Sequence, residues 1–232
     1  MNTRQIWHFG MPIVSKSSSS PSIFPILTLL FASYHHRIAF GQPAQAAMGL
    51  GWAQEFLARV TKTAITEFNS TTNSSYHTEQ YFPLKNGQNI FVDATHDTII
   101  SAVITTLDFA SFAAAGPPPS THIPLNRSFV TAEISPFAAN LQAQIISCPS
   151  PSSPSTPAEK SIRWFLNDAL VPLDHIEGCT KNAVGSCELE TYVARLSKRL
   201  TSIDWAYDCR ESHRRSFQQI GDSILTNLVF EH

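Results

Sequence analysis

The stretch from residue 89 to residue 112 constrains the fold more than any other part of this 232-residue sequence. NIFVDAT (89–95) is a short apolar run, and DTIISAVITTLDFASF (97–112) then repeats apolar residues at helical spacing. The first run does not simply alternate between apolar and polar residues, which is typical of a strand buried on both faces. A buried strand that passes directly into a mostly buried helix favours an α/β fold.

Two further segments have the pattern of helices. CELETYVARLSKRL (187–200) predicts an amphipathic helix, with Ser186 placed to cap its first turn. QPAQAAMGLGWAQEFLARVTKTAI (42–65) predicts a helix whose apolar side chains share one face. These side chains are Trp52, Phe56, Leu57 and Val60.

Two strand patterns lie between these helices. PFAANLQAQIISC (136–148) and SIRWFLNDALVPL (161–173) flank a linker rich in proline and serine. The pair Asn167-Asp168, set between two apolar runs, predicts a hairpin turn. Strands that alternate with helices along the chain again indicate the α/β class.

The charges of the sequence do not indicate a nucleic-acid-binding protein. Sixteen Lys and Arg residues stand against 18 Asp and Glu residues, which gives a formal net charge of −2 and no basic stripe. The one basic cluster, Arg210 with Arg214 and Arg215, is typical of a solvated tail. We therefore expect no nucleic-acid partner.

Cysteines and glycosylation sequons point to an oxidising, secretory compartment. None of the four cysteines forms a CxxC pair, so the sequence does not indicate a zinc site. Cys179 and Cys187 bracket a short loop of the kind that a disulfide closes. Three Asn-x-Ser/Thr sequons in polar, loop-like segments predict glycosylation at Asn69, Asn73 and Asn126.

Residues 1–41 differ in character from the rest and form an atypical leader. IFPILTLLFASY (23–34) is apolar but too short for a comfortable membrane span, so we expect no stable one. An A-x-A pattern at residues 44–46 follows only after a long gap, which makes a poorly formed signal peptide. The neighbouring His35 and His36 have no partner at metal-ligand spacing, so we expect no metal there.

His96 and Asp97 are the strongest candidates for chemistry, because they come where the predicted strand passes into the predicted helix. In open α/β sheets, ligands collect at the carboxyl ends of strands, where helix N-termini favour anions such as phosphate. A phosphate dianion favours the protonated form of a neighbouring carboxyl group. Asp97 then serves as a general acid towards a departing alkoxide, and a cationic His96 holds a phosphoryl oxygen.

Two other interpretations of this pair remain open from the residues alone. In the first interpretation, the pair is only a polar turn in which Thr95 or Asp97 caps the helix. Alternatively, it belongs to a metal-dependent HD-type phosphohydrolase with His77 as a further ligand. That type of site lies within helices and needs more His and Asp ligands, and the strand predicted before His96 argues against it.

The segment FVDATHDTIISAVITTLDF resembles the corresponding HD segment of the secreted histidine acid phosphatases, in particular their fungal phytase-like branch. The resemblance extends in family order over residues 42–209, from QAAMGLGWAQEFLARVT to GSCELETYVARLSKRLTSIDWAYDC. It implies a phosphomonoester or inorganic phosphate as ligand, no cofactor, Asp97 as proton donor and His96 as phosphate ligand. It also implies the C-terminal part of the phosphoglycerate-mutase-like α/β domain, with an incomplete sheet and flanking helices.

The sequence departs from this family in one decisive respect. The family attacks phosphate with a histidine in an R-H-G-x-R-x-P motif, and the 232 residues contain no such motif. YHHRIAFG (34–41) has the wrong order of residues. We therefore expect an atypical leader at 1–41, a partial, catalytically incompetent domain at 42–209 and a divergent tail at 210–232.

The resemblance also implies how the cysteines pair. The family counterparts of Cys179 and Cys187 bond to each other, whereas those of Cys148 and Cys209 bond to partners in the segment that has no counterpart here. We therefore expect two unpaired thiols unless Cys148 and Cys209 bond to each other. A non-catalytic secreted glycoprotein with a residual phosphate-binding pocket is the alternative to an acid phosphatase or phytase.

Overall fold

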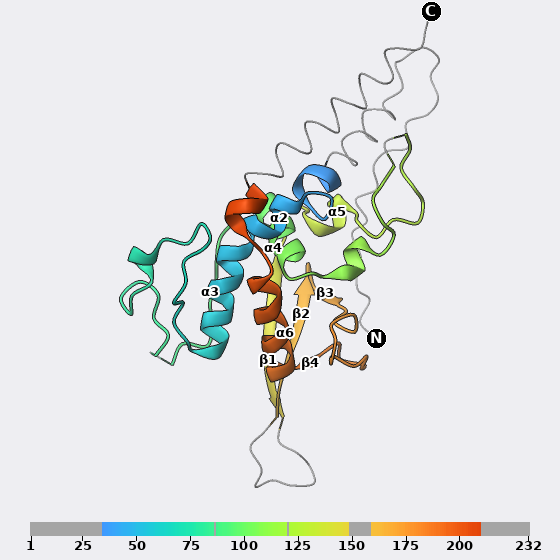
Figure 1. The fold of residues 1–232 in the computed structure, drawn as a ribbon. Coiled ribbons are helices and arrows are strands. Elements are labelled where there is room, and N and C mark those ends of the chain that lie inside the picture. The colour runs from blue at the N-terminus through green and yellow to red at the C-terminus, as the bar shows by residue number, and fades with distance from the viewer. Residues whose placement is uncertain (1–33, 86, 120, 149–158, 210–232) are drawn as a thin grey trace, which may run out of the picture.

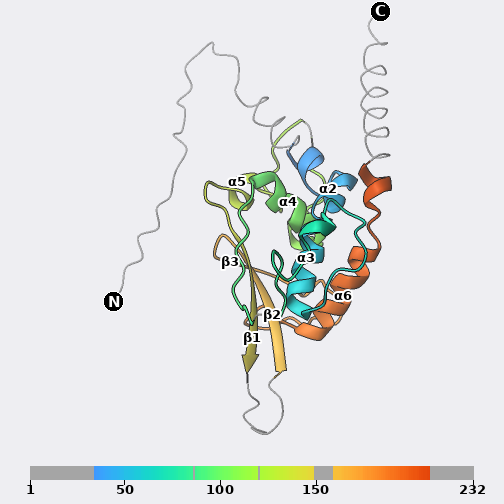
Figure 2. The same ribbon diagram turned by 90° about the vertical axis from the view of Figure 1, so that its left-hand side faces the viewer.

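The computed structural model describes residues 34–85, 87–119, 121–148 and 159–209. Within these residues a small antiparallel sheet has helices α3 and α6 on one of its faces, while α2, α4 and α5 gather at one end (Figures 1 and 2). The helices are α2 (Pro43–Met48), α3 (Leu50–Thr61), α4 (Asp97–Thr106), α5 (Thr131–Ile134) and α6 (Leu189–Thr201). This mixed α/β architecture confirms the predicted fold class.

The sheet is built around one antiparallel hairpin. Strand β2 (Glu159–Leu166) pairs with β1 (Leu141–Cys148) on one side and with β3 (Ala169–Val171) on the other. The short β4 (Cys187–Glu188) also pairs with β2. Between β2 and β3, Asn167 and Asp168 have positive φ angles of 50° and 66°, as a two-residue type I′ turn requires. The predicted hairpin turn is confirmed.

The two faces of the sheet have different environments. Ile162, Trp164 and Leu166 alternate along β2 towards the helices and are buried. Trp164 is at the centre of the core: its ring centroid lies 5.0 Å from that of Phe56 and 5.4 Å from that of Phe109. The intervening side chains of β2 are only partly buried, since no helix of the described residues covers the other face of the sheet (Figure 2).

The helix expected over residues 42–65 is two helices, and the second ends early. Gly49 separates α2 from α3, and a Cβ atom there would overlap the Thr106 hydroxyl and approach the Ala102 carbonyl oxygen of α4 to 2.8 Å. The close contact between the α2–α3 junction and α4 therefore depends on a glycine. Helix α3 ends at Thr61 because Lys62 adopts the left-handed conformation, with φ 56°.

The prediction of a buried strand at residues 89–95 is wrong. The segment forms no strand, and the side chains of Ile90 and Val92 are 78% and 87% exposed. A strand needs a neighbour for its main-chain groups, and within the described residues no neighbour pairs with this run. Phe91 and Asp93 instead bind side chains of α3.

Two predictions about helix ends also need correction. Helix α4 ends at Thr106, and a separate 3-10 turn, Ala110–Ala113, occupies the rest of the helix expected over 97–112. Ser186 does not cap α6: the N-cap residue is Glu188, whose carboxylate accepts a hydrogen bond from the Thr191 hydroxyl.

Residues 34–41 pack onto this framework. Residues 34–38 are helical, Ala39 is fully buried, and the ring of His35 meets that of Phe129 edge-on, with centroids 5.3 Å apart. The division of the chain at residue 42 stays a prediction, as does the character of residues 1–33 and 210–232, which lie outside the described residues.

Candidate functional site

His96 and Asp97 lie together at the start of α4, where the sequence places them. His96 is the N-cap residue, and its carbonyl oxygen accepts hydrogen bonds from the backbone N–H groups of Ile99 and Ile100 at 3.1 and 3.2 Å. Asp97 is the first residue of the ten-residue helix. Both are exposed. The pair is therefore accessible at the positive end of the helix dipole.

Neither side chain is fully committed to the fold. One oxygen of the Asp97 carboxylate accepts the backbone N–H of Thr98 at 2.8 Å. The Ser135 hydroxyl donates to the Asp97 carbonyl oxygen at 3.4 Å, at the limit of a hydrogen bond. Across the described part of the chain, no hydrogen bond or ion pair engages the His96 ring. The His96 side chain does not cap the helix.

His96 and Asp97, together called the HD corner, lie on an open surface. Two cavities, of about 170 and 210 Å³, lie against α6 and within the proline-rich loop at residues 115–129, and neither is lined by His96 or Asp97. Both side chains are exposed to solvent, so a ligand can reach them.

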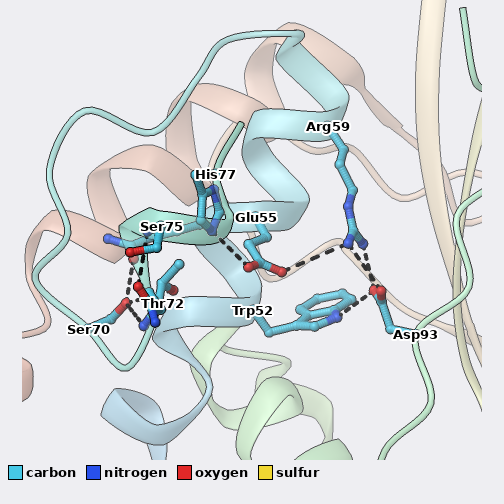
Figure 3. Close-up of polar contacts among 10 residues, drawn as sticks. Trp52, Glu55, Arg59, Ser70, Thr72, Ser75, His77 and Asp93 are labelled. Carbon is cyan, nitrogen blue, oxygen red and sulfur yellow. Dashed lines mark hydrogen bonds and ion pairs between the residues drawn. The ribbon is translucent and has the colours of Figure 1, made fainter. Parts of the chain in front are cut away.

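Asp93, three residues before His96, is held by three polar contacts from α3 (Figure 3). The Arg59 guanidinium donates to its two carboxylate oxygens at 2.6 and 3.1 Å. The Trp52 indole N–H donates to the same carboxylate at 3.0 Å. Helix α3 supplies both donors, so it holds the segment that leads into α4.

Two aromatic rings lie against the Arg59 guanidinium. Its central carbon lies 5.1 Å from the ring centroid of Phe82 and 5.2 Å from that of Phe91, distances at which cation–π attraction operates. Burial alone would raise the pKa of Asp93, but the hydrogen bonds and charge of Arg59, helped by Trp52, hold that pKa below its usual value. Asp93 is an anion in the folded protein well into the acid range.

His77 belongs to the same network and not to the HD corner. Its Nε2 lies 3.0 Å from the Glu55 carboxylate, which is itself 3.8 Å from Arg59 (Figure 3). Among the residues that the structure describes, no three His, Cys, Asp or Glu side chains gather as metal ligands do. The network ties the loop at residues 67–93 to α3, and the metal-dependent interpretation gains no support from it.

The sequence interpretation missed this network. Glu55 and Arg59 have the spacing of an i,i+4 ion pair, which was the one local signal. The contact of Arg59 and Trp52 with Asp93 joins residues more than 30 positions apart, and no local pattern reveals such a contact.

The predicted disulfide and sequons lie away from the HD corner. Cys179 and Cys187 are bonded, with 4.9 Å between their Cα atoms, which confirms the predicted disulfide. Cys209 has a free, partly buried thiol, and the side chain of Cys148 lies outside the described residues. All three sequon residues are exposed: Asn69, Asn73 and Asn126. No helix of the described segments is both long and apolar enough to span a membrane.

Comparison with known proteins places this chain in a family. The model of the histidine phosphatase superfamily (branch 2) matches residues 26–167, more than half of the sequence. The chain belongs to the histidine phosphatase superfamily, branch 2.

Its relatives are fungal phytases. Phytase A of Aspergillus terreus is 25% identical over 182 residues, which cover 78% of this chain and 36% of that protein. Phytase A of Aspergillus awamori is 27% identical over 169 residues, which cover 72% of this chain and 33% of that protein. The chain thus spans about a third of the length of these curated relatives.

Proposed function

We propose that the HD corner serves phosphomonoester hydrolysis of the acid phosphatase and phytase type, with His96 as phosphate ligand and Asp97 as proton donor. The observation that carries this proposal is the position of the two exposed side chains, side by side at the N-terminus of α4, in a member of the histidine phosphatase superfamily. Backbone N–H groups and the helix dipole favour a phosphate there. The names of the relatives make phytate the first substrate to test.

The chemical roles follow from the two side chains. An imidazolium donates a charge-assisted hydrogen bond to a phosphoryl oxygen, and such bonds are stronger than those between neutral groups. A protonated Asp97 gives its proton to the alkoxide that leaves as the P–O bond breaks. The carboxylate keeps one oxygen free of the Thr98 N–H, so it can face a ligand without loss of its helical contact.

We further propose that this polypeptide does not turn over phosphomonoesters alone. The 232 residues contain no R-H-G-x-R-x-P motif, so they lack the histidine that attacks phosphorus in the family. A proton donor without a nucleophile does not open the route through a covalent phosphoenzyme. The expected activity of the chain is phosphate binding without hydrolysis.

Calorimetric titration of the full chain with inorganic phosphate tests the role of His96. The variant His96→Gln removes the cationic donor, and we expect its affinity for phosphate to fall by roughly tenfold or more, as expected for the loss of a hydrogen bond to a charged group. His122→Gln, at an exposed histidine in the proline-rich loop, is the matched control and should bind like the wild type. Equal phosphate affinity of the wild type and His96→Gln would rule out the proposed ligand role.

A second candidate function is that of a secreted, non-catalytic glycoprotein that retains a weak phosphate site. The disulfide and the exposure of the three sequon asparagines favour it, since both features suit an oxidising secretory compartment. Glycans at these positions would support this candidate, whereas phosphate binding without turnover is expected of both candidates and does not separate them.

A further inference from the structure

The segment that carries the HD corner has few contacts of its own. Between Asn89 and Thr95 the chain forms no strand, and within the described residues its main-chain N–H groups make no hydrogen bond. Ala94 and Thr95, which connect Asp93 to His96, are both exposed. Backbone without hydrogen bonds keeps its conformational freedom unless side-chain contacts fix it.

Asp93 is the last residue of this segment that is anchored. The three donor–acceptor contacts from Trp52 and Arg59 use both of its carboxylate oxygens (Figure 3). The Arg59 side chain is only 15% exposed and that of Asp93 is 36% exposed, so solvent screens this pair less than it screens an ordinary surface ion pair.

The donors themselves are held in place. Trp52 stacks on Phe56, with ring centroids 5.5 Å apart and planes 12° from parallel, and Phe56 packs on the buried Trp164. Arg59 lies against the rings of Phe82 and Phe91. The anchor of Asp93 is therefore connected through α3 to the core of the molecule.

From these contacts we infer that Asp93 is a positioning residue for the HD corner. Arg59 and Trp52 fix its carboxylate, and this fixes the chain that enters α4, so that the His96 side chain is presented at the helix N-terminus before a ligand arrives. A preorganised site pays less ordering entropy on binding, so the anchor raises affinity without touching the ligand. This inference rests on the proposed role of His96 as phosphate ligand.

The test compares Asp93→Asn with the wild-type full chain in two measurements. Asn has one carbonyl oxygen and no charge, so it cannot accept the paired N–H groups of Arg59 as a carboxylate does. We expect backbone ¹⁵N order parameters at residues 94–96 to fall from about 0.85 to about 0.6 or lower. We expect the calorimetric affinity of Asp93→Asn for inorganic phosphate to fall by about tenfold, because the less ordered site loses more entropy when it binds.

Two further variants separate positioning from general stability. Arg195, on α6, forms an ion pair with Glu177 at 2.7 Å. Arg195→Gln breaks this pair and is the matched control, with phosphate affinity expected within twofold of wild type. Asp93→Glu keeps a carboxylate within reach of Arg59 and should recover most of the affinity. Melting temperatures of all variants show whether each remains folded.

The outcomes distinguish the inference from the proposed function. Loss of order and of phosphate affinity in Asp93→Asn, with recovery in Asp93→Glu, supports positioning. Unchanged order, or lost order with unchanged affinity, overturns it while the role of His96 stands. Absence of phosphate binding by the wild type overturns the proposed function, and the positioning role with it.

Discussion

His35 is a buried side chain that affects the stability of this protein in acid. Its side chain is almost fully buried, its ring meets those of Phe129 and His36 edge-on, and its Nδ1 has no hydrogen-bond partner among the described residues. Burial, followed by the neighbouring His36, lowers the pKa of His35 from 6.5 to about 4. The folded protein therefore keeps this imidazole neutral at pH values where an exposed histidine carries a charge.

This lowered pKa predicts a loss of stability in mild acid. Between pH 6.5 and pH 4 the unfolded chain binds a proton at His35 and the folded chain does not. The contribution of neutral His35 to the free energy of unfolding is therefore full above pH 6.5 and is lost as the pH decreases towards 4. We expect His35→Phe to remove a fall on the order of 2 kcal/mol in the free energy of unfolding over this range.

Urea denaturation of the wild type and His35→Phe at pH 7, 5.5 and 4.5 measures the difference between their pH dependences. His122→Gln is the control, because this histidine is exposed and its replacement should leave the pH dependence unchanged. Parallel pH profiles for the wild type and His35→Phe would show that His35 is not kept neutral by burial.

At the scale of the element, the accuracy of the sequence prediction depended on whether the partners were local. The Asn167-Asp168 turn and the helix that begins at Asp97 follow from neighbouring residues, and both form. The apolar run at residues 89–95 satisfies the local pattern of a buried strand, but strand formation depends on neighbours that the pattern does not name. The anchor of Asp93 likewise required contacts across more than 30 residues.

The same distinction applies to the candidate site. The position of His96 and Asp97 at a helix start was predictable, since helix periodicity begins immediately after them. Their exposure was not, because the run before them was expected to be buried. The contacts of Arg59 with Phe82 and Phe91 were also beyond prediction, since a cation–π contact has no sequence spacing of its own.

The junction between α2 and α3 provides a prediction at this scale. Gly49 lies against α4, where the Thr106 hydroxyl is 2.8 Å from the carbonyl oxygens of Ala46 and Ala102. Gly49→Ala places a methyl group into this contact, and overpacking of this kind costs about 1–3 kcal/mol. We expect a lower melting temperature and a lower denaturation midpoint.

Chemical denaturation of Gly49→Ala beside Lys198→Ala tests this contact. Lys198 is on the exposed face of α6, and its replacement should change stability by no more than about 0.5 kcal/mol. A Gly49→Ala variant as stable as the wild type would mean that α2 and α4 are not in close contact at this residue.

At the scale of the whole molecule, the described residues form a sheet with helices α3 and α6 on one face, and α4, which begins at the HD corner, lies with α2 and α5 at one end (Figures 1 and 2). The chain belongs to the histidine phosphatase superfamily, yet spans about a third of the length of its phytase relatives. Among the described residues, no helix covers the second face of the sheet, and the segment before the HD corner carries exposed apolar side chains, such as those of Ile90 and Val92. We propose that this chain keeps a phosphate ligand and a proton donor but not the nucleophile.

Steady-state hydrolysis of an aryl phosphate and of phytate by the purified full chain, beside Asp97→Asn, tests this account most directly. Asp97→Asn is an internal baseline, since it removes only the proposed proton donor. The account predicts phosphate release no faster than that of Asp97→Asn across pH 3–7. Turnover by the wild type that Asp97→Asn abolishes would contradict it, and would show that a nucleophile is present after all.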